Sequence, residues 1–389
     1  QQVRPTMKNP TPFPYRASEL TNQRLTDLIQ TVYPDVTVGG YTVISEKSFD
    51  AATEEVSTAG RIELQLQYEG DNTHDLVEQV VVKVSRPDLG ALPLYENEVA
   101  FYTRLRPELE IQTPQCLGGE HDDSTGQFGL ALEDLNQHQA LFPDVTTPLT
   151  PDAIKSLLNT LALLHARYWN TPRFETDLSW IQPHTHGSLY SLFNDPNAVP
   201  ALIRHEIDNN QFKRELVERA GQTADGLYHE FRKLQQHQAG LPQTVCHGDT
   251  HIGNTYLLPD NAGATNRGGL IDWQLMSRGY CMHDVTYLLI TGLSVKQRRE
   301  NQQDLLRYYL EQLAANGVKQ RPEFDEIWLE YRRAAVWGVY IGWLTTPIEN
   351  YGWDITVNNH IRLLTAYDDL DTKAAIAELP EVAGFSLKS

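Results

Sequence analysis

The chain has 389 residues, of which 40% are hydrophobic and 21% are charged, and its formal net charge at pH 7 is −19. A chain of this length exceeds what one simple core usually organises, so two lobes or domains are expected. A surface this acidic repels phosphate backbones and anionic lipid headgroups, which disfavours nucleic acids and membrane surfaces as partners. It is compatible with a cationic substrate, although many enzymes are simply acidic.

Neither a membrane span nor a disulfide scaffold is indicated. No apolar run approaches the ~18 residues that a membrane-spanning helix needs, and no signal-peptide core is recognisable. The three cysteines, Cys116, Cys246 and Cys281, are odd in number and far apart, with no C-x-x-C pair. They argue against a disulfide framework and a structural zinc cluster, and we expect a reducing, cytoplasmic compartment.

The N-terminal third predicts a small α+β unit. Residues 1–20 form a proline-studded arm, and a helix is expected over about 21–31. Three strands follow in GYTVIS, RIELQLQY and QVVVKVS, and then a helix over about 92–105. The apolar stretch GLALEDL closes the region and ends abruptly in acidic residues. Strands, one main helix and a closing strand make an α+β unit over residues 21–134.

The pattern then becomes mainly helical over residues 135–389. PDAIKSLLNTLALLHARYWN has apolar residues at helical spacing, and Thr150 or Asp152 can cap its start. Helices are also expected within 201–239, within 295–315 and in FDEIWLEYRRAAVWGVYIGWL. Two short apolar runs, NTYLL and GLIDW, flank the turn-rich PDNAGATNRG and predict a β-hairpin inside this helical region.

The most concentrated polar chemistry lies in VCHGDTHIGN, residues 245–254. His247 and His251 stand four residues apart, a spacing that suits zinc when both lie on one helix face. Two glycines, Gly248 and Gly253, and the strand expected next disfavour a helix there. A zinc hydrolase built on the two histidines is therefore the less favoured interpretation.

Phosphoryl transfer accounts for the same segment. That chemistry needs a group that holds the acceptor hydroxyl and hard oxygen ligands for magnesium. Asp249 and Asn254 stand five apart on a tight loop, so one can face an acceptor hydroxyl while the other offers an amide oxygen to the metal. Asp272 ends the second apolar run, and a hairpin places it beside the loop that starts the first. The pattern predicts a two-ligand magnesium site with a candidate base next to it.

HGDTHIGN followed by IDWQ resembles the catalytic and metal-binding signature of the aminoglycoside phosphotransferase and choline kinase superfamily, small-molecule relatives of the protein kinases. The resemblance implies a bilobal, protein-kinase-like fold of the α+β class. Its nucleotide-binding N-lobe, residues 21–134, would hold an antiparallel sheet and one key helix. Its C-lobe, residues 135–389, would be mainly helical and bind the acceptor. The resemblance makes Asp249 the catalytic base and gives Asn254 and Asp272 to Mg²⁺.

The same resemblance gives two further residues structural roles. His247 would support the catalytic loop, and Asp284, in CMHDVTYLL, would brace the backbone of that loop. The alternative for Asp284 is that it caps a helix starting near Val285, and both roles can hold together. His251 and Gln274 are expected to orient the loop or the metal ligands.

The N-terminal unit contains candidates for the nucleotide site that the resemblance implies. Lys83 lies inside the apolar strand VVVKVS, where an ammonium group needs a partner. Glu98 falls on the apolar stripe of the following helix, so it faces the core, whereas Glu96 points away. A buried Lys83–Glu98 pair that presents the lysine to phosphates is the kinase arrangement, with an ordinary structural ion pair as the alternative. In LALEDL, which resembles the hinge between lobes, the backbone from Glu133 to Leu135 is expected to bind adenine.

One loop departs from the kinase pattern. SEKSFDAATEEVSTAG lacks G-x-G-x-x-G and has a single glycine at its end, which leaves Ser57, Thr58 or backbone amides to cover the phosphates. The expected activity is an ATP- and Mg²⁺-dependent phosphorylation of a hydroxyl group on a small-molecule alcohol in the cytoplasm. The alternative is a pseudokinase or metabolite-binding module without turnover.

Further segments, LLHARYW, EDLNQH, YRRAAVWGVYIGWL and TAYDDLD, resemble an ecdysteroid-kinase-like subgroup, and the likeness spans about residues 20–372. The sequence does not identify the acceptor molecule. Aromatic residues near the C-terminus suit a partly apolar alcohol or a quaternary amine, but core packing is expected for at least half of them. They are Trp328, Tyr331, Trp337, Tyr340, Trp343, Tyr351 and Trp353. His165, Trp169 and Trp273 are interpreted as packed residues rather than catalysts.

Overall fold

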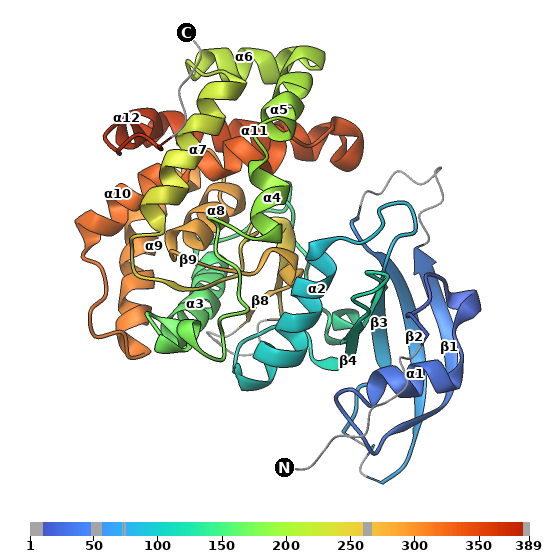
Figure 1. Ribbon diagram of the computed structural model, residues 1–389. Helices are drawn as coiled ribbons and strands as arrows, with labels where there is room; N and C mark the ends of the chain where they lie inside the picture. Colours follow the sequence, from blue (N-terminus) through green and yellow to red (C-terminus); the bar gives the residue numbers. More distant parts are fainter. Residues whose placement is uncertain (1–10, 48–56, 72, 74, 260–266, 384–389) are drawn as a thin grey trace. The chain divides into compact units, whose positions relative to one another are not determined.

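The computed structural model describes residues 11–47, 57–71, 73, 75–259 and 267–383, with every side chain except that of Trp343. The chain divides into two compact units (Figure 1). The first holds Gln1–Glu108 and Pro114–Gln137, and the second holds Leu109–Thr113 and His138–Ser389.

The first unit is built on a five-stranded antiparallel sheet in the order β1-β2-β3-β5-β4. Its strands are β1 (Thr37–Lys47), β2 (Gly60–Glu69), β3 (Gln79–Val84), β4 (Cys116–His121) and β5 (Phe128–Glu133). The three strands expected first are confirmed, and GLALEDL overlaps β5 from Gly129 to Glu133. The sequence did not indicate β4, because CLGGEH contains two glycines and little alternation of apolar and polar residues.

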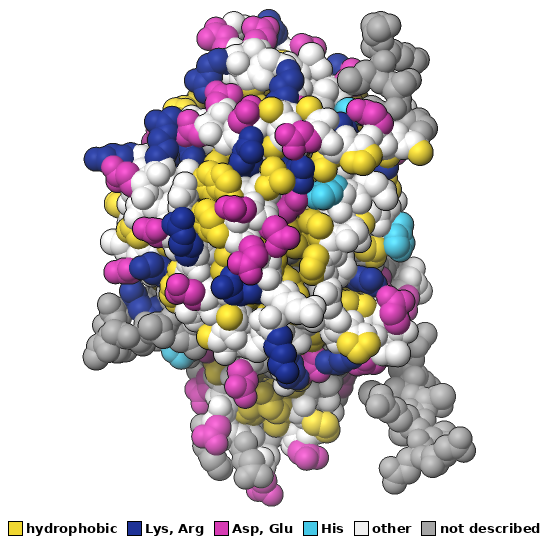
Figure 2. All heavy atoms as spheres, turned by 90° about the vertical axis from the view of Figure 1, so that its left-hand side faces the viewer, with side chains coloured by type: hydrophobic (Ala, Val, Ile, Leu, Met, Phe, Trp, Pro, Cys, Tyr) yellow, Lys and Arg dark blue, Asp and Glu magenta, His cyan; other side chains and the backbone are white. Residues whose placement is uncertain are grey.

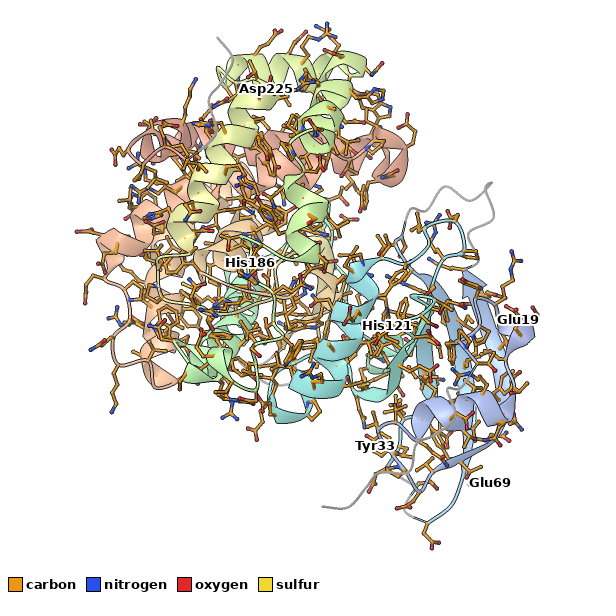
Figure 3. All side chains as sticks on the ribbon, in the orientation of Figure 1. Glu19, Tyr33, Glu69, His121, His186 and Asp225 are labelled. Carbon is orange, nitrogen blue, oxygen red and sulfur yellow. The ribbon has the colours of Figure 1, made fainter. Side chains whose placement is uncertain are left out.

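Two helices complete this unit, α1 (Asn22–Ile29) and α2 (Pro93–Ala100), and α2 continues as a π-helical turn over Phe101–Leu105. Helix α1 lies so close to β4 that a Cβ atom at Gly118 would fall 2.2 Å from the Leu28 carbonyl oxygen. Figure 3 labels Tyr33, which follows α1. The Tyr33 hydroxyl accepts a hydrogen bond of 2.7 Å from Gln115 Nε2. Of the predicted arm, residues 1–10 lie outside the description. In the rest of the arm, Phe13, Ala17 and Leu20 are buried in the sheet core, and Phe13 is only 1% exposed.

The second unit is mainly helical, as expected. Its helices are α3 (Pro151–Tyr168), α4 (Ser188–Asn194), α5 (Ala198–Asn209), α6 (Gln211–Arg219), α7 (Ala224–Gln238), α8 (Met282–Gly292), α9 (Val295–Ala315), α10 (Phe324–Ala334), α11 (Ile348–Asp369) and α12 (Thr372–Ala377). The predicted cap of α3 is confirmed, since the Thr150 side chain accepts a hydrogen bond from the Ala153 amide at 3.2 Å. Every residue of α8 is buried, and this helix packs against α3, α9, α10 and α11 (Figure 1).

Two small antiparallel strand pairs lie among these helices. The predicted hairpin is confirmed as β7 (Thr255–Leu257) paired with β8 (Gly268–Leu270), while its turn, 260–266, lies outside the described residues. A second pair joins β6 (Thr244–Cys246) to β9 (Ser277–Gly279). Together the two pairs bring the segments before and after the hairpin side by side.

The surface mixes both signs of charge. Acidic and basic side chains are interspersed over the face that Figure 2 shows, so the negative net charge is not gathered in one patch there. The three cysteines are free and buried. Within the described residues, no helix combines the length and the apolarity that crossing a bilayer requires.

Candidate functional site

The polar segment 247–254 forms a tight loop between β6 and β7 in the second unit. Gly248 has a φ of 90°, and a Cβ atom there would fall 1.9 Å from the Leu275 carbonyl oxygen, so only glycine fits. The Gly248 carbonyl accepts a hydrogen bond of 2.9 Å from His283 Nε2. The loop therefore packs closely on the segment that follows the hairpin and is hydrogen-bonded to the start of α8.

Asp284 fixes the backbone of this loop from inside α8. Its carboxylate accepts hydrogen bonds from the amides of His247 at 2.7 Å and Gly248 at 2.9 Å. Its carbonyl oxygen accepts a third from Thr250 Oγ1 at 2.6 Å. Helix α8 already begins at Met282, so Asp284 lies within its first turn and does not cap it, and the capping alternative is wrong.

The buried carboxylate of Asp284 has a further partner in His165. His165 Nε2 lies 3.0 Å from Asp284 Oδ2, and its Nδ1 is bonded to the Tyr309 hydroxyl at 2.7 Å. Burial by itself raises the pKa of Asp284, but the hydrogen bond from His165 and the neighbouring His283 and His247 bring it below its ordinary value. His165, interpreted from the sequence as a packed residue, is thus part of the loop's support.

His247 supports the loop through both ring nitrogens. Its Nδ1 accepts the Asp249 amide at 3.2 Å, and its Nε2 donates to the Ile271 carbonyl at 2.8 Å. Its ring packs on Trp273, with 4.6 Å between ring centroids. Since both nitrogens are engaged, His247 does not offer a ligand to zinc, and the zinc alternative loses one of its two histidines.

Among the described residues, one group of three potential metal ligands comes together: His165, Cys246 and Asp284. All three are buried, and Asp284 is committed to the loop amides. Burial raises the pKa of the Cys246 thiol well above its ordinary value, which disfavours the thiolate that a metal needs. We interpret this group as structural.

Asp249 and Asn254 are brought together at the mouth of the loop. Asn254 Nδ2 donates to the Asp249 carbonyl oxygen at 2.9 Å and to its carboxylate Oδ2 at 3.0 Å. The amide nitrogen therefore orients Asp249, and the amide oxygen is the atom that Asn254 can offer to a metal. The Asp249 side chain keeps 28% of its surface exposed, so a substrate can reach it.

Asp272 follows β8 at the same end of the hairpin. The Ile271 amide donates to the Asn254 carbonyl at 3.0 Å, which extends the ladder by one residue and leaves Asp272 beside the loop. Asp272 adopts φ 63° and ψ 69°, a left-handed conformation that costs a residue other than glycine about 1–3 kcal/mol. Such strained residues cluster at functional sites, so the conformation supports Asp272 as a candidate ligand. The structure therefore places Asp249, Asn254 and Asp272 at the same end of the hairpin, as the sequence predicts.

The oxygen atoms at this end of the hairpin suit a hard divalent cation. Burial raises the pKa of Asp249, and the negative charge of Asp272 raises it further, against the opposing effect of His251 and His247. The two carboxylates therefore repel each other. A cation held by Asp272 and by the amide oxygen of Asn254 would offset that repulsion, and Mg²⁺ prefers such ligands.

In the first unit, Lys83 on β3 and Glu98 on α2 form a buried ion pair. Lys83 Nζ lies 2.7 Å and 2.6 Å from the two carboxylate oxygens. Glu98 is fully buried and Lys83 is 6% exposed, whereas Glu96 on the same helix is exposed, as the helical stripe predicts. The contacts to both carboxylate oxygens hold the lysine in one orientation. Removing one partner from such a buried pair costs about 3–5 kcal/mol.

The backbone expected to bind adenine ends the sheet of the first unit. The Glu133 amide donates to the Gln115 carbonyl at 2.9 Å, and the Asp134 amide donates to the Gln79 carbonyl at 3.0 Å. The sheet thus uses two of the three amides in this segment. The Leu135 amide is the donor that stays a candidate for adenine.

The phosphate-covering loop is described only at its end, because residues 48–56 lie outside the described residues. The Ser57 carbonyl accepts a hydrogen bond of 2.6 Å from Arg86 Nη1, and the Thr58 carbonyl accepts one of 2.5 Å from the Tyr95 hydroxyl. These contacts anchor the end of the loop, and its role at phosphates stays a prediction.

Tyr351 is a neighbour of the site that the sequence did not single out. It lies just before the bend of α11 at Gly352, and partial burial together with the charges of Asp249 and Asp272 raises its pKa to about 12. Among the C-terminal aromatic residues, Tyr331, Trp337 and Tyr340 are buried, whereas Tyr351 and Trp353 are 43% and 61% exposed. Nothing in the local sequence separates these two groups.

We expect Asp284→Asn to destabilise the protein, because the two loop amides bind different carboxylate oxygens and an asparagine keeps an acceptor at only one of these positions. The folded pKa of Asp284 is lowered, so its stabilisation is present above the unfolded value of about 3.9 and is lost as the pH falls through the folded value. The free energy of unfolding, measured in urea, should differ by about 1–3 kcal/mol near neutral pH. The difference in unfolding free energy between wild type and variant should become smaller at acidic pH.

The control for this variant is Asp304→Asn, which changes an exposed aspartate of α9 in the same way. An equal loss in the two variants would contradict the assigned role of Asp284. So would a wild-type advantage that stays constant on acidification.

Comparison with known proteins assigns the chain to a family. A model of the ecdysteroid kinase-like family matches residues 56–320. An uncharacterized kinase-like protein of Caenorhabditis elegans is 33% identical over 204 residues, which cover 50% of this chain and 50% of that protein. An uncharacterized oxidoreductase of the same organism is 24% identical over 243 residues, 59% of this chain and 28% of that protein. The chain therefore spans half or less of the length of these curated relatives.

Solved structures show a more distant likeness. A microcompartment-associated aminopropanol kinase is 15% identical with a TM-score of 0.45, and the match covers 86% of this chain and 94% of that one. An ethanolamine kinase of Plasmodium vivax is 12% identical with a TM-score of 0.47, over 85% and 83% of the two chains. TM-scores below 0.5 do not decide a fold, whereas the family model spans well over half of the sequence. The chain belongs to the ecdysteroid kinase-like family, a family of kinase-like phosphotransferases.

Proposed function

We propose that the protein transfers the γ-phosphoryl group of ATP, with Mg²⁺, to a hydroxyl group of a small-molecule alcohol. The observation that supports this most strongly is the arrangement of Asp249, Asn254 and Asp272 at one end of the β7–β8 hairpin. The family description supports it as well, since it names a kinase of ecdysteroids, which are alcohols.

In the proposed mechanism, Asp249 orients the acceptor hydroxyl and takes up its proton late in the transfer. A bond forms between the acceptor oxygen and the γ-phosphorus, the bond from that phosphorus to the β-phosphate oxygen breaks, and ADP leaves. Asn254 keeps the Asp249 carboxylate in place through its 3.0 Å hydrogen bond. Asn254 and Asp272 would hold Mg²⁺, which when bound neutralises charge on the phosphates.

The nucleotide roles fall to the first unit. Lys83 would position the phosphates, and Glu98 would keep its ammonium group in one orientation through the buried pair. The Leu135 amide, and the carbonyl groups of the segment that starts at Glu133, would bind adenine. Because the ion pair is buried in the sheet and helix, a nucleotide would meet a lysine that is already oriented.

We expect Asp249→Asn to lower kcat by about 10²–10⁴-fold while MgATP affinity changes less than about threefold, because the base acts on the acceptor and not on the nucleotide. Transfer of labelled phosphate gives the rate, and calorimetric titration gives the affinity. Activity equal to wild type would remove Asp249 as the base. MgATP binding by the wild type without transfer to any alcohol would favour the metabolite-binding alternative.

We expect Glu98→Gln to raise the KM for ATP by about tenfold or more, because Lys83 then loses its charged partner and its fixed orientation. Initial rates at varied ATP concentration measure this effect, and thermal unfolding reports whether the variant is folded. Glu96→Gln is the matched control, since Glu96 is exposed on the same helix. The same KM in both variants would mean that the buried pair is only structural.

A further inference from the structure

His283, in the first turn of α8, holds a carbonyl group of the loop that carries Asp249. Its Nε2 atom donates a hydrogen bond of 2.9 Å to the Gly248 carbonyl oxygen. Asp284, the next residue of the helix, accepts a hydrogen bond of 2.9 Å from the Gly248 amide. Two neighbouring residues of α8 therefore hold both backbone groups of Gly248, whereas the brace expected from the sequence accounts only for the amide.

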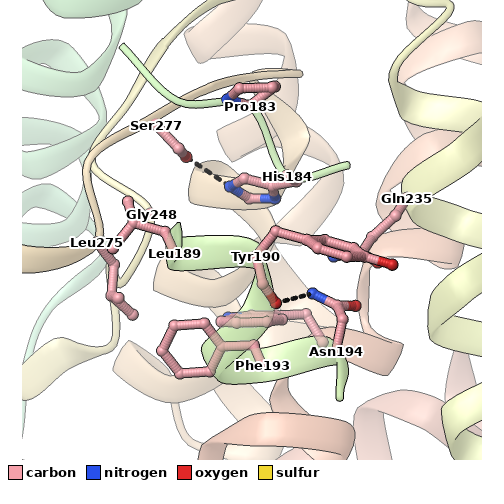
Figure 4. Close-up of a pocket in the computed structure, with 11 residues that line it drawn as sticks. Pro183, His184, Leu189, Tyr190, Phe193, Asn194, Gln235, Gly248, Leu275 and Ser277 are labelled. Carbon is pink, nitrogen blue, oxygen red and sulfur yellow. Dashed lines mark hydrogen bonds between the residues drawn. The ribbon is translucent and has the colours of Figure 1, made fainter. Parts of the chain in front are cut away.

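The imidazole ring of His283 is enclosed by other side chains. His283 is 2% exposed, and the centroid of its ring lies 4.5 Å from that of His184 and 4.7 Å from that of Trp337. His184 is itself held in place, because its Nε2 is hydrogen-bonded to Ser277 Oγ of β9 (Figure 4). A ring packed in this way has little room to rotate, so its Nε2 stays directed at the Gly248 carbonyl.

Both histidine rings are neutral near pH 7. Burial lowers the pKa of His283, and the charge of Asp284 and the bond to the Gly248 carbonyl oppose this less strongly. Burial and the neighbouring His283 lower the pKa of His184 to about 3. A carbonyl oxygen only accepts hydrogen bonds, so the neutral ring of His283 must carry its proton on Nε2. The hydrogen bond to Gly248 therefore specifies one tautomer.

The Gly248 carbonyl belongs to the peptide group that leads into Asp249. Gly248 is buried, and a buried carbonyl without a donor is unfavourable. Rotation of the peptide group could pair the carbonyl again, and glycine opposes such a rotation little because it has no Cβ atom. The rotation would break the 3.2 Å hydrogen bond from the Asp249 amide to His247 Nδ1. The backbone from which the Asp249 side chain projects would then be loosened.

We propose that His283 is a positioning residue of the phosphoryl transfer, which fixes the backbone at Asp249 by holding the Gly248 carbonyl. The assignment rests on the proposed phosphotransferase function and adds a residue to it. His283 acts through the loop and not on the nucleotide, so its removal slows the chemical step more than it weakens nucleotide binding. A misplacement of about 1 Å at a reacting group can lower a rate by about 10²-fold.

The first test compares two variants of His283. His283→Leu removes the donor and keeps a buried side chain, whereas His283→Gln keeps an N–H group at about the position of the imidazole Nε2. We expect His283→Leu to lower kcat by about tenfold or more, with a KM for ATP within about threefold of wild type. His283→Gln should recover kcat to within about threefold of wild type. Transfer of labelled phosphate is measured to the best acceptor among glycerol, ethanolamine, choline and benzyl alcohol, or to water where none of them reacts.

His360→Leu is the matched control. His360 is also a buried histidine of the second unit, 1% exposed, and its ring packs on Phe212 of α6. This variant should keep the kcat and the KM of the wild type. An unchanged kcat in His283→Leu, equal losses in His283→Leu and His283→Gln, or the same loss in His360→Leu would overturn the assignment.

The second test measures the tautomer of His283 by nuclear magnetic resonance and needs neither activity nor the leucine variant. With isotopically labelled histidine nitrogens, the signal that is lost in His283→Gln identifies His283 among the 13 histidines. Its nitrogen shifts should show a neutral ring protonated at Nε2 at pH 7. A ring protonated only at Nδ1 cannot donate to Gly248 and would overturn the assignment, even if His283→Leu does not fold.

The outcomes separate the two levels of the proposal. Wild-type activity that persists in His283→Leu would remove the positioning role and leave the phosphotransferase function standing. A wild type that neither transfers phosphate to an alcohol nor hydrolyses ATP would contradict the proposed function, and the positioning role would fail with it.

Discussion

The buried carboxylate of Asp284 is the constraint on which the candidate site depends. It accepts hydrogen bonds from two amides of the loop 247–254 and contacts the ring of His165, and it lies in α8, whose residues are all buried among four other helices. A buried charge is tolerated only when it is fully hydrogen-bonded, so the loop and the helix stabilise each other. The same bonds fix the backbone just before Asp249, so the core, and not the loop alone, sets the position of the proposed base.

Around this fixed point the structure accumulates features that are unfavourable without a ligand. Asp272 is held in a left-handed conformation, and its charge opposes ionisation of Asp249. The conformation and the repulsion each cost stability, and a divalent cation held by Asp272 and Asn254 would offset the repulsion. A metal-binding role would account for the placement of both carboxylates.

The sequence predicted the parts of the site that lie close together along the chain. The spacing of Asp249 and Asn254, the turn-rich hairpin that returns at Asp272 and the lone lysine in an apolar strand were each readable, because local geometry or burial leaves few alternatives. Strand β4 was missed because CLGGEH lacks alternation, and β6 and β9 are only three residues long. A pocket next to Gly248 (Figure 4) could not be predicted at all, since its wall joins residues from Pro183 to Trp337 that are ordinary in their own neighbourhoods. His165 could be recognised from the sequence as a polar ring on the buried face of α3. Its partner, Asp284, is identified only by the fold.

The central claim, that Asn254 and Asp272 hold a nucleotide-bound metal ion, is tested most directly by the thermal midpoint with ATP, with and without Mg²⁺. The account predicts a magnesium-dependent rise in the wild type, worth about 2.7 kcal/mol at a hundredfold excess over the dissociation constant. Asp272→Ala should lose this rise. Asp371→Ala is the matched control and should keep the rise. Asp371 is also an aspartate in a left-handed conformation, but it follows the end of α11 and is not part of the candidate site. No magnesium-dependent rise in the wild type, or the same rise in Asp272→Ala, would contradict the account.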